Sequence, residues 1–140
     1  MTEGAYEFAK GKPMNQPVAT DVKVFVPAIN FAQSLAFYKA MGWHLDWKAD
    51  DNSLAVLELA DKRFYLQNYY AKDWADNFMM HITVEDAHAW WHHALNVINQ
   101  GGFKHARVKK PKEEPYGAVV TYVWDPSGVL LHFAQSVMGK

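Results

Sequence analysis

Two stretches of similar pattern, Lys23-Val24-Phe25-Val26 and His81-Ile82-Thr83-Val84, lie 58 residues apart in the chain. Each contains β-branched residues in alternation, which is typical of a strand with one buried face. A residue suited to cap a helix follows each stretch, Asn30 in the first case and Asp86 in the second. The same strand–helix pattern thus occurs twice, which predicts two modules with the same order of elements.

The first module is expected to span about residues 20–70. Its helix runs from Asn30 to Gly42, a position where a left-handed residue favours helix termination. Short runs rich in β-branched and aromatic residues predict three further strands, at 43–47, 54–59 and 64–67. Alternation along the first of these strands places Trp43 and Trp47 on one face.

The second module is expected to span about residues 78–136. Asp86 caps a helix that runs from residue 87 to about 99 and ends at Gly101-Gly102. Strands are expected at 80–84, around Val108, at 116–124 and at 129–134. The stretch 109–115 is rich in charge and contains two prolines, so a solvated loop is expected there.

The order of elements, β-α-β-β-β repeated, predicts an α+β fold. Each half is too small to bury both faces of its own sheet. The two halves are therefore expected to form a shared, partly open curved sheet, with helices on one face and a groove on the other. The prediction is a single domain over 20–140, preceded by an arm at 1–19 that contains two glycines and two prolines.

Composition restricts the classes of function. The chain has 140 residues, 14 Lys plus Arg, 15 Asp plus Glu and a net charge of −1, which argues against binding to nucleic acid. The absence of cysteine excludes disulfides, thiolate metal sites and a cysteine nucleophile. No apolar run approaches the roughly 18 residues of a membrane span, and residues 1–10 lack the apolar core of a signal peptide. A cytoplasmic protein without a membrane partner is expected.

Four motifs together resemble the vicinal oxygen chelate superfamily, the group of glyoxalases, bleomycin resistance proteins and extradiol dioxygenases. They are the stretch 30–42 with Phe37-Tyr38 and Met41-Gly42, the stretch 81–86, Pro115-Tyr116-Gly117, and Asp125-Pro126-Ser127-Gly128 followed by Leu130-Leu131-His132-Phe133. The resemblance covers about residues 20–136. It implies a concave cleft for a small molecule and a homodimer whose clefts are completed across the interface. The scaffold hosts lyases, isomerases, dioxygenases, transferases and non-catalytic drug binders, so the fold does not decide the function.

The resemblance also implies a divalent metal, with ligands on the first and last strands of each module. His81 stands at one such position, and His132 stands where the family usually has Glu. Lys23 occupies the position of a His or Gln, and a protonated lysine repels a metal ion. The fourth position falls on Tyr65 or Gln67. The expectation is therefore either no cofactor or a divalent metal held by His81, His132 and Gln67.

Strand alternation suggests which side chains face the cleft. His81 and Thr83 point to the side opposite Ile82 and Val84, so the histidine faces either the groove or, as an alternative, a hydrogen-bonding partner in the core. Aromatic residues on the strands suit a flat ligand. The residues expected to line the cleft are Lys23, Phe25, Tyr65, Gln67, His81, Thr83, Tyr122 and His132.

Two functions of different class follow from these residues. The first is a binding protein for a small aromatic or anionic ligand, without a standard metal site. The alternative is a metal-dependent lyase, isomerase or dioxygenase that uses His81 and His132 as ligands. A protein that binds a peptide in the aromatic groove has no support beyond the aromatic content.

Overall fold

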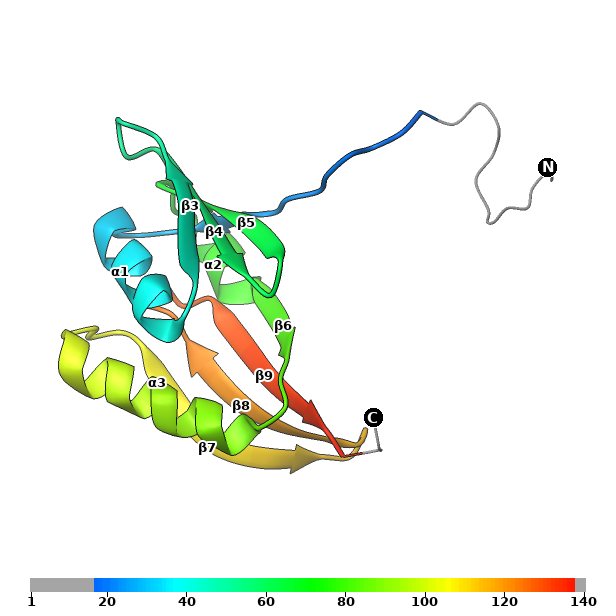
Figure 1. Ribbon diagram of the computed structural model, residues 1–140. Helices are drawn as coiled ribbons and strands as arrows, with labels where there is room; N and C mark the ends of the chain where they lie inside the picture. Colours follow the sequence, from blue (N-terminus) through cyan, green and yellow to red (C-terminus); the bar gives the residue numbers. More distant parts are fainter. Residues whose placement is uncertain (1–16, 138–140) are drawn as a thin grey trace.

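The computed structural model describes residues 17–137. The expected arm at 1–19 therefore lies almost wholly outside the described residues, as do the last three residues of the expected domain. Residues 17–24 form no helix or strand, and they lead away from the body of the protein (Figure 1).

The two halves of the chain have the same order of elements. The first contains β2 (Phe25–Pro27), α1 (Phe31–Met41), β3 (His44–Lys48), β4 (Leu54–Leu59) and β5 (Lys62–Gln67). The second contains β6 (Met79–Thr83), α3 (Ala87–Gly101), β7 (Arg107–Glu114), β8 (Ala118–Trp124) and β9 (Leu130–Ser136). The short helix α2 (Lys72–Asn77) connects them. The predicted α+β fold of two β-α-β-β-β modules is confirmed.

Each module forms its own four-stranded mixed sheet, with the order β2-β5-β4-β3 in sheet 1 and β6-β9-β8-β7 in sheet 2. In both sheets the first strand pairs in parallel with the last, and the remaining pairs are antiparallel. No hydrogen-bonded ladder joins the two sheets within residues 17–137. The shared surface that the sequence predicts is thus built from two adjacent sheets and contains no closed barrel.

The helix termini follow the predicted capping chemistry. The Asn30 side chain accepts a hydrogen bond of 3.0 Å from the Gln33 amide, and Asp86 accepts one of 3.1 Å from the Ala89 amide. Gly102 ends α3 in the left-handed region, with φ of 68°. None of the helices in the described part of the chain is long and apolar enough to cross a membrane.

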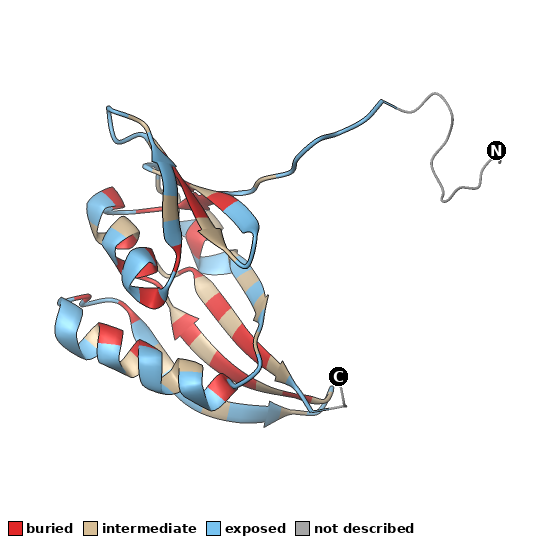
Figure 2. Cartoon of the chain, in the orientation of Figure 1, coloured by how far each residue is buried: buried red, intermediate tan, exposed pale blue. Residues whose placement is uncertain are grey.

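One core holds both modules together. Helices α1 and α3 pack against each other and lie on the same side of the two sheets (Figure 1). Phe37 and Tyr38 of α1 are fully buried, as are Leu66 and Phe133 of the two last strands. Trp90 of α3 stacks on Phe133, with ring centroids 4.5 Å apart. The alternating burial along β8 and β9 (Figure 2) shows that sheet 2 covers this core with one face and leaves the other open.

A buried polar contact also connects the modules. The Tyr38 hydroxyl donates a hydrogen bond of 2.6 Å to Oδ2 of Asp125, which lies in the turn between β8 and β9. Oδ1 of Asp125 accepts from the amides of Ser127 and Val129, at 2.7 and 3.0 Å. Burial raises the pKa of Asp125 to about 6, although these hydrogen bonds act in the opposite direction. Burial also raises the pKa of Tyr38 well above its ordinary value.

Three sequence predictions about local structure are wrong. The stretch 109–115 is not a loop, because residues 109–114 belong to strand β7 and only Pro115 lies in the turn after it, and a register shift between Lys109 and Lys112 accommodates Pro111. The first strand begins at Phe25 and excludes 22–24. Helix α2 was not expected from the sequence.

The prediction that Trp43 and Trp47 lie on one face of a strand is wrong, because the strand contains a β-bulge. The register between β3 and β4 shifts between Leu45 and Trp47. Trp43 is therefore buried in the core, whereas Trp47 is 52% exposed. One extra residue in a strand reverses the facing of every side chain beyond it.

Candidate functional site

The open face of sheet 2 brings three predicted residues into one cluster. His81 of β6 lies directly opposite His132 of β9 in the parallel ladder, and Tyr122 of β8 lies opposite His132 on its other side. The rings of Tyr122 and His132 meet edge to face, with centroids 4.9 Å apart. Thr83 follows two residues after His81 on the same exposed face. The sequence left two orientations open for His81, toward the groove or toward a partner in the core, and in the structure His81 is exposed on the open face.

The protonation of this cluster is set by burial and by charge. Partial burial lowers the pKa of His132, and the neighbouring His81 lowers it further. Nε2 of His132 lies 3.3 Å from the sulfur of Met79. Burial raises the pKa of Tyr122, and its hydroxyl donates to the carboxylate of Glu114, which raises the pKa further. The cluster presents a neutral imidazole and a neutral phenol to solvent at pH 7.

The open face of sheet 1 carries the other predicted residues. Phe25 and Tyr65 stack with ring centroids 4.9 Å apart and an interplanar angle of 20°. The ammonium of Lys23 lies 5.6 Å from the centroid of Tyr65 and forms an ion pair with Asp21. Gln67 lies two residues beyond Tyr65 in β5, opposite Pro27. Tyr65 and Gln67 therefore lie on the same open face. The sequence left the fourth ligand position open between these two residues, and both face the same side of the sheet.

The structure thus divides the predicted cleft between two sheets. Sheet 1 and the segment before it carry Lys23, Phe25, Tyr65 and Gln67, and sheet 2 carries His81, Thr83, Tyr122 and His132. Each group is a contiguous set on one open face. The Lys23 ammonium pairs with Asp21 and lies over the ring of Tyr65, so it belongs to the group on sheet 1.

The expected metal ligands do not form a complete site within one chain. His81 and His132 are adjacent, but Gln67 belongs to the other sheet. No group of three or more His, Cys, Asp and Glu residues within 17–137 is placed to hold a metal ion. A catalytic metal usually needs about three protein ligands. Two adjacent imidazoles do not meet that requirement, so the donor set that residues 17–137 of one chain bring together does not fit a catalytic metal.

A cavity beside this cluster contains residues that the sequence analysis did not select as cleft residues. It has a volume of about 650 Å³ and lies over β7, β8 and the start of β9. Lys109, Lys112 and Trp124 line it together with Tyr122. The guanidinium carbon of Arg107 lies 4.1 Å from the centroid of the Trp124 ring. The alternation Arg107-Val108-Lys109 was the available signal, and the prolines and charges after it favoured a loop.

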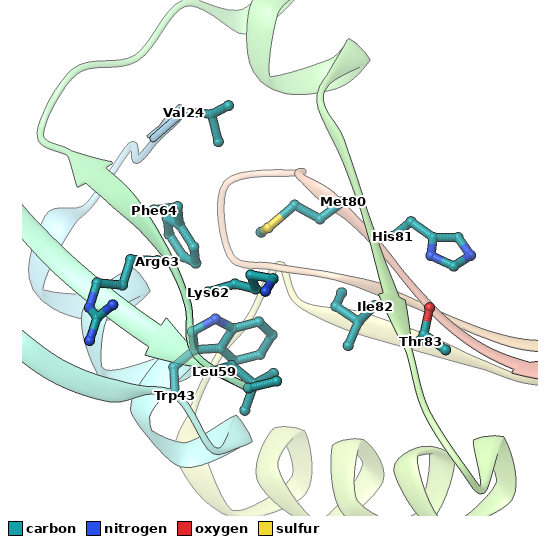
Figure 3. A pocket seen from close by; sticks show the side chains of 11 residues that line it. Val24, Trp43, Leu59, Lys62, Arg63, Phe64, Met80, His81, Ile82 and Thr83 are labelled. Atoms are coloured by element: carbon teal, nitrogen blue, oxygen red, sulfur yellow. The ribbon is translucent and has the colours of Figure 1, made fainter. Parts of the chain in front are cut away.

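A second crevice lies between the two sheets. Its volume is about 410 Å³, and its apolar walls include Trp43, Phe64 and Met80. Met80 points into this crevice, whereas the imidazole of His81 points away from it (Figure 3). His81 and Thr83 also line this crevice, so β6 forms part of its wall, although the imidazole of His81 is directed away from the interior.

Solved structures share this fold. The bleomycin-binding protein of Streptomyces verticillus, complexed with copper(II)-bleomycin, superposes with a TM-score of 0.68 and 19% identity over 85% of this chain and 99% of its own. An antibiotic-binding protein from a Streptomyces species gives 0.65 and 16% over 86% and 99%. Lactoylglutathione lyase from Agrobacterium tumefaciens gives 0.59 and 13% over 85% and 95%.

At these identities the likeness establishes the fold. No family model matches the chain, and no curated protein matches it. The relatives include two binding proteins and a lyase, so the likeness leaves the chemistry to the residues of the site.

Proposed function

We propose that this chain, which has the fold of the bleomycin-binding and glyoxalase/bleomycin resistance proteins, binds a small aromatic or anionic molecule on the open faces of its sheets. The observation that carries the proposal is the contiguous cluster of His81, His132 and Tyr122 on a sheet face that no helix covers. Side chains of this kind combine an apolar body with hydrogen-bonding groups, which suits a planar polar ligand. All eight residues expected to line the cleft are candidate ligand contacts.

We further propose that the protein is a homodimer in the cytoplasm. A single open sheet is a shallow surface, and a second copy whose sheet 1 faces sheet 2 would form a cleft with two walls. Large apolar side chains are exposed near these faces, with Phe25 43% and Met79 60% accessible. The face of sheet 1 would then supply Tyr65 and Gln67 of one copy opposite the histidines of the other.

The alternative is a metal-dependent lyase, isomerase or dioxygenase that uses His81 and His132. The adjacency of the two imidazoles is the observation in its favour. A third donor from the same chain is missing among residues 17–137, and His132 is already in contact with the sulfur of Met79. The binding protein is therefore the function that the geometry supports better.

The test is a ligand screen by melting temperature, with calorimetry for each compound that stabilises the protein. We expect at least one planar aromatic compound to raise the melting temperature by several degrees. The variants His132→Ala and Tyr122→Leu should lose this response. His88→Ala, an exposed histidine of α3, is the matched control and should respond as the original protein does.

Two results would overturn the proposal. One is a screen in which no aromatic or anionic compound stabilises the protein. The other is stoichiometric binding of Mn, Fe(II), Ni or Zn that a His81→Ala, His132→Ala double variant abolishes, which would favour the enzyme. Light scattering tests the dimer separately, because a monomer at all concentrations would leave the two-walled cleft without support.

A further inference from the structure

We infer that the cavity over β7 and β8 is a subsite for a planar aromatic acid that is anionic at neutral pH. This inference rests on the proposed binding function and assigns a ligand class to one part of the open face. It concerns a set of cations and an indole ring located away from the histidine pair.

Trp124 is a half-buried aromatic platform with two cations against it. In the β7–β8 ladder Arg107 lies directly opposite Trp124, and Lys109 lies opposite Tyr122. The guanidinium carbon of Arg107 is 4.1 Å from the centroid of the indole, and the ammonium of Lys109 is 5.6 Å from it. A guanidinium stacked on an indole keeps its N–H donors free at the edge of the plane. The platform therefore offers both a ring surface and donors for an acid group.

Three of the four cations of this strand have no acidic partner in the described part of the chain. The side chains of Arg107, Lys109 and Lys110 form no hydrogen bond or ion pair with any residue within 17–137. The nearby carboxylate of Glu114 accepts from the Tyr122 hydroxyl and lies 3.8 Å from Lys112. A chain with a net charge of −1 thus places the unpaired Lys109 and Lys110 in the wall of this cavity, and the unpaired Arg107 in an adjoining hollow that shares Trp124 with it. An anion that binds there gains attraction without having to displace an internal partner.

The size of the cavity suits a small ring system. A volume of about 650 Å³ lies within the usual range of roughly 300–1,000 Å³ for small-molecule pockets. Leu130 and Trp124 supply apolar contact, and Lys109 and Lys110 lie at the wall. The register shift between Lys109 and Lys112 makes β7 irregular at this point, and irregular strands commonly occur beside binding sites.

A nucleic acid is the other polyanion that basic and aromatic residues attract. The unpaired cations Arg107, Lys109 and Lys110 lie on one β-strand, beside a single indole ring, whereas a phosphate backbone is usually met by a basic groove that follows the nucleic-acid strand. The single cavity favours a small acid.

The test compares two probes of similar shape, 2-naphthoate and the neutral 2-naphthalenemethanol, by calorimetry on the full chain. We expect 2-naphthoate to bind at least about tenfold more tightly, a preference that increasing salt reduces. The double variant Arg107→Gln, Lys109→Gln should weaken 2-naphthoate about tenfold or more and change the neutral probe less than about twofold. Lys39→Gln, an exposed lysine of α1, is the matched control and should alter neither affinity.

The outcomes separate this inference from the proposed function. Equal affinity for both probes, unchanged in the double variant, would overturn the aromatic-acid subsite and leave a general aromatic binder. Failure of both probes and of the wider screen would overturn the binding function itself. Tighter binding of a single-stranded oligonucleotide than of 2-naphthoate, lost in the same double variant, would also overturn the inference. Trp124→Leu provides a further check, because it should weaken both probes through loss of the ring.

Discussion

The two sheets have the same strand topology, but their open faces carry different charged groups. In the parallel ladder of sheet 1, Phe25 lies opposite Tyr65, and the equivalent pair in sheet 2 is Thr83 and Ala134. Two residues before the first pair, the chain has Lys23, just ahead of β2, and Arg63 in β5. Two residues before the second pair, it has His81 and His132. The same position of the repeat thus carries two permanent cations in one sheet and two titratable imidazoles in the other.

Two cations on the open side of sheet 1, Arg63 and Lys23, are neutralised within the module. Arg63 lies 2.7 Å from Asp46 and 3.4 Å from Glu58, and Lys23 is paired with Asp21. Arg107, Lys109 and Lys110 of β7 in sheet 2 lack such partners among the described residues, and only Lys112 of that strand pairs there with an acid, Glu114. A duplicated scaffold can therefore satisfy its charges internally on one face and leave them available to a ligand on the other. We regard sheet 2 as the face adapted to bind anions.

The largest expected effect concerns the contact that holds the two sheets in one unit. Asp125→Ala should lower the free energy of unfolding by about 3–5 kcal/mol, because the Tyr38 hydroxyl and the amides of Ser127 and Val129 lose a buried acceptor. Urea denaturation measures this change. Asp50→Ala in the exposed turn before β4 is the control, and an equal effect there would contradict the role assigned to Asp125.

The same residue should make stability depend on pH. The folded-state pKa of Asp125 is raised from 3.8 to about 6, so folding favours the protonated form. Its contribution to stability is fully present below pH 3.8 and declines by about 3 kcal/mol as pH rises through 6. Denaturation of the original chain and of Asp125→Asn between pH 3.5 and 7 tests this.

The difference between those two proteins isolates Asp125. The pKa of His132 is lowered, so its contribution has the opposite sign and is lost as pH falls. This contribution is common to both proteins and cancels. A stability difference that does not change with pH would show that Asp125 does not titrate in this range.

A smaller effect on melting temperature should distinguish the loss of a paired cation from the loss of an unpaired one. Arg63→Gln should lower the melting temperature by less than about 4 °C at low salt, and the loss should shrink as salt increases. Lys110→Gln removes an unpaired charge from β7 and should leave the melting temperature unchanged or slightly higher. Equal losses in both variants would remove the contrast between the two faces.

The smallest expected effect is a shift in one titration. His81→Ala should raise the pKa of His132, since the charge of His81 is one of the two causes that lower it. An NMR titration of the imidazole signals measures this shift. His88→Ala should leave the titration of His132 unchanged, and an unchanged pKa in His81→Ala would contradict the proximity of the two rings.

The sequence predicted most of the fold because its signals are local. Asn30 and Asp86 cap helices through their own side chains, and Gly102 ends a helix through its own backbone freedom. The errors fell where strand pairing overrides such signals. The charged stretch 109–115 is a strand because β8 pairs with it, and Trp47 faces solvent because of a bulge in β3.

The candidate site was predicted only in part. Alternation placed His81 and Thr83 on an open face, and the structure agrees with that placement. It did not place Gln67 beside the histidines, because the two modules form separate sheets. It also did not identify Arg107 and Trp124 as neighbours, since their contact depends on the register of two strands.

By itself the sequence determined the two modules, their helix caps and the residues available to each open face, because these follow from backbone preferences and side-chain alternation. Tertiary structure decided which of those residues meet and which charges are neutralised. Arg63 has acidic partners and Arg107 has none in the part of the chain that the structure describes, although both are exposed arginines on strands. Charge pairing acts over a few ångströms between strands distant in the chain, and no local pattern encodes that distance.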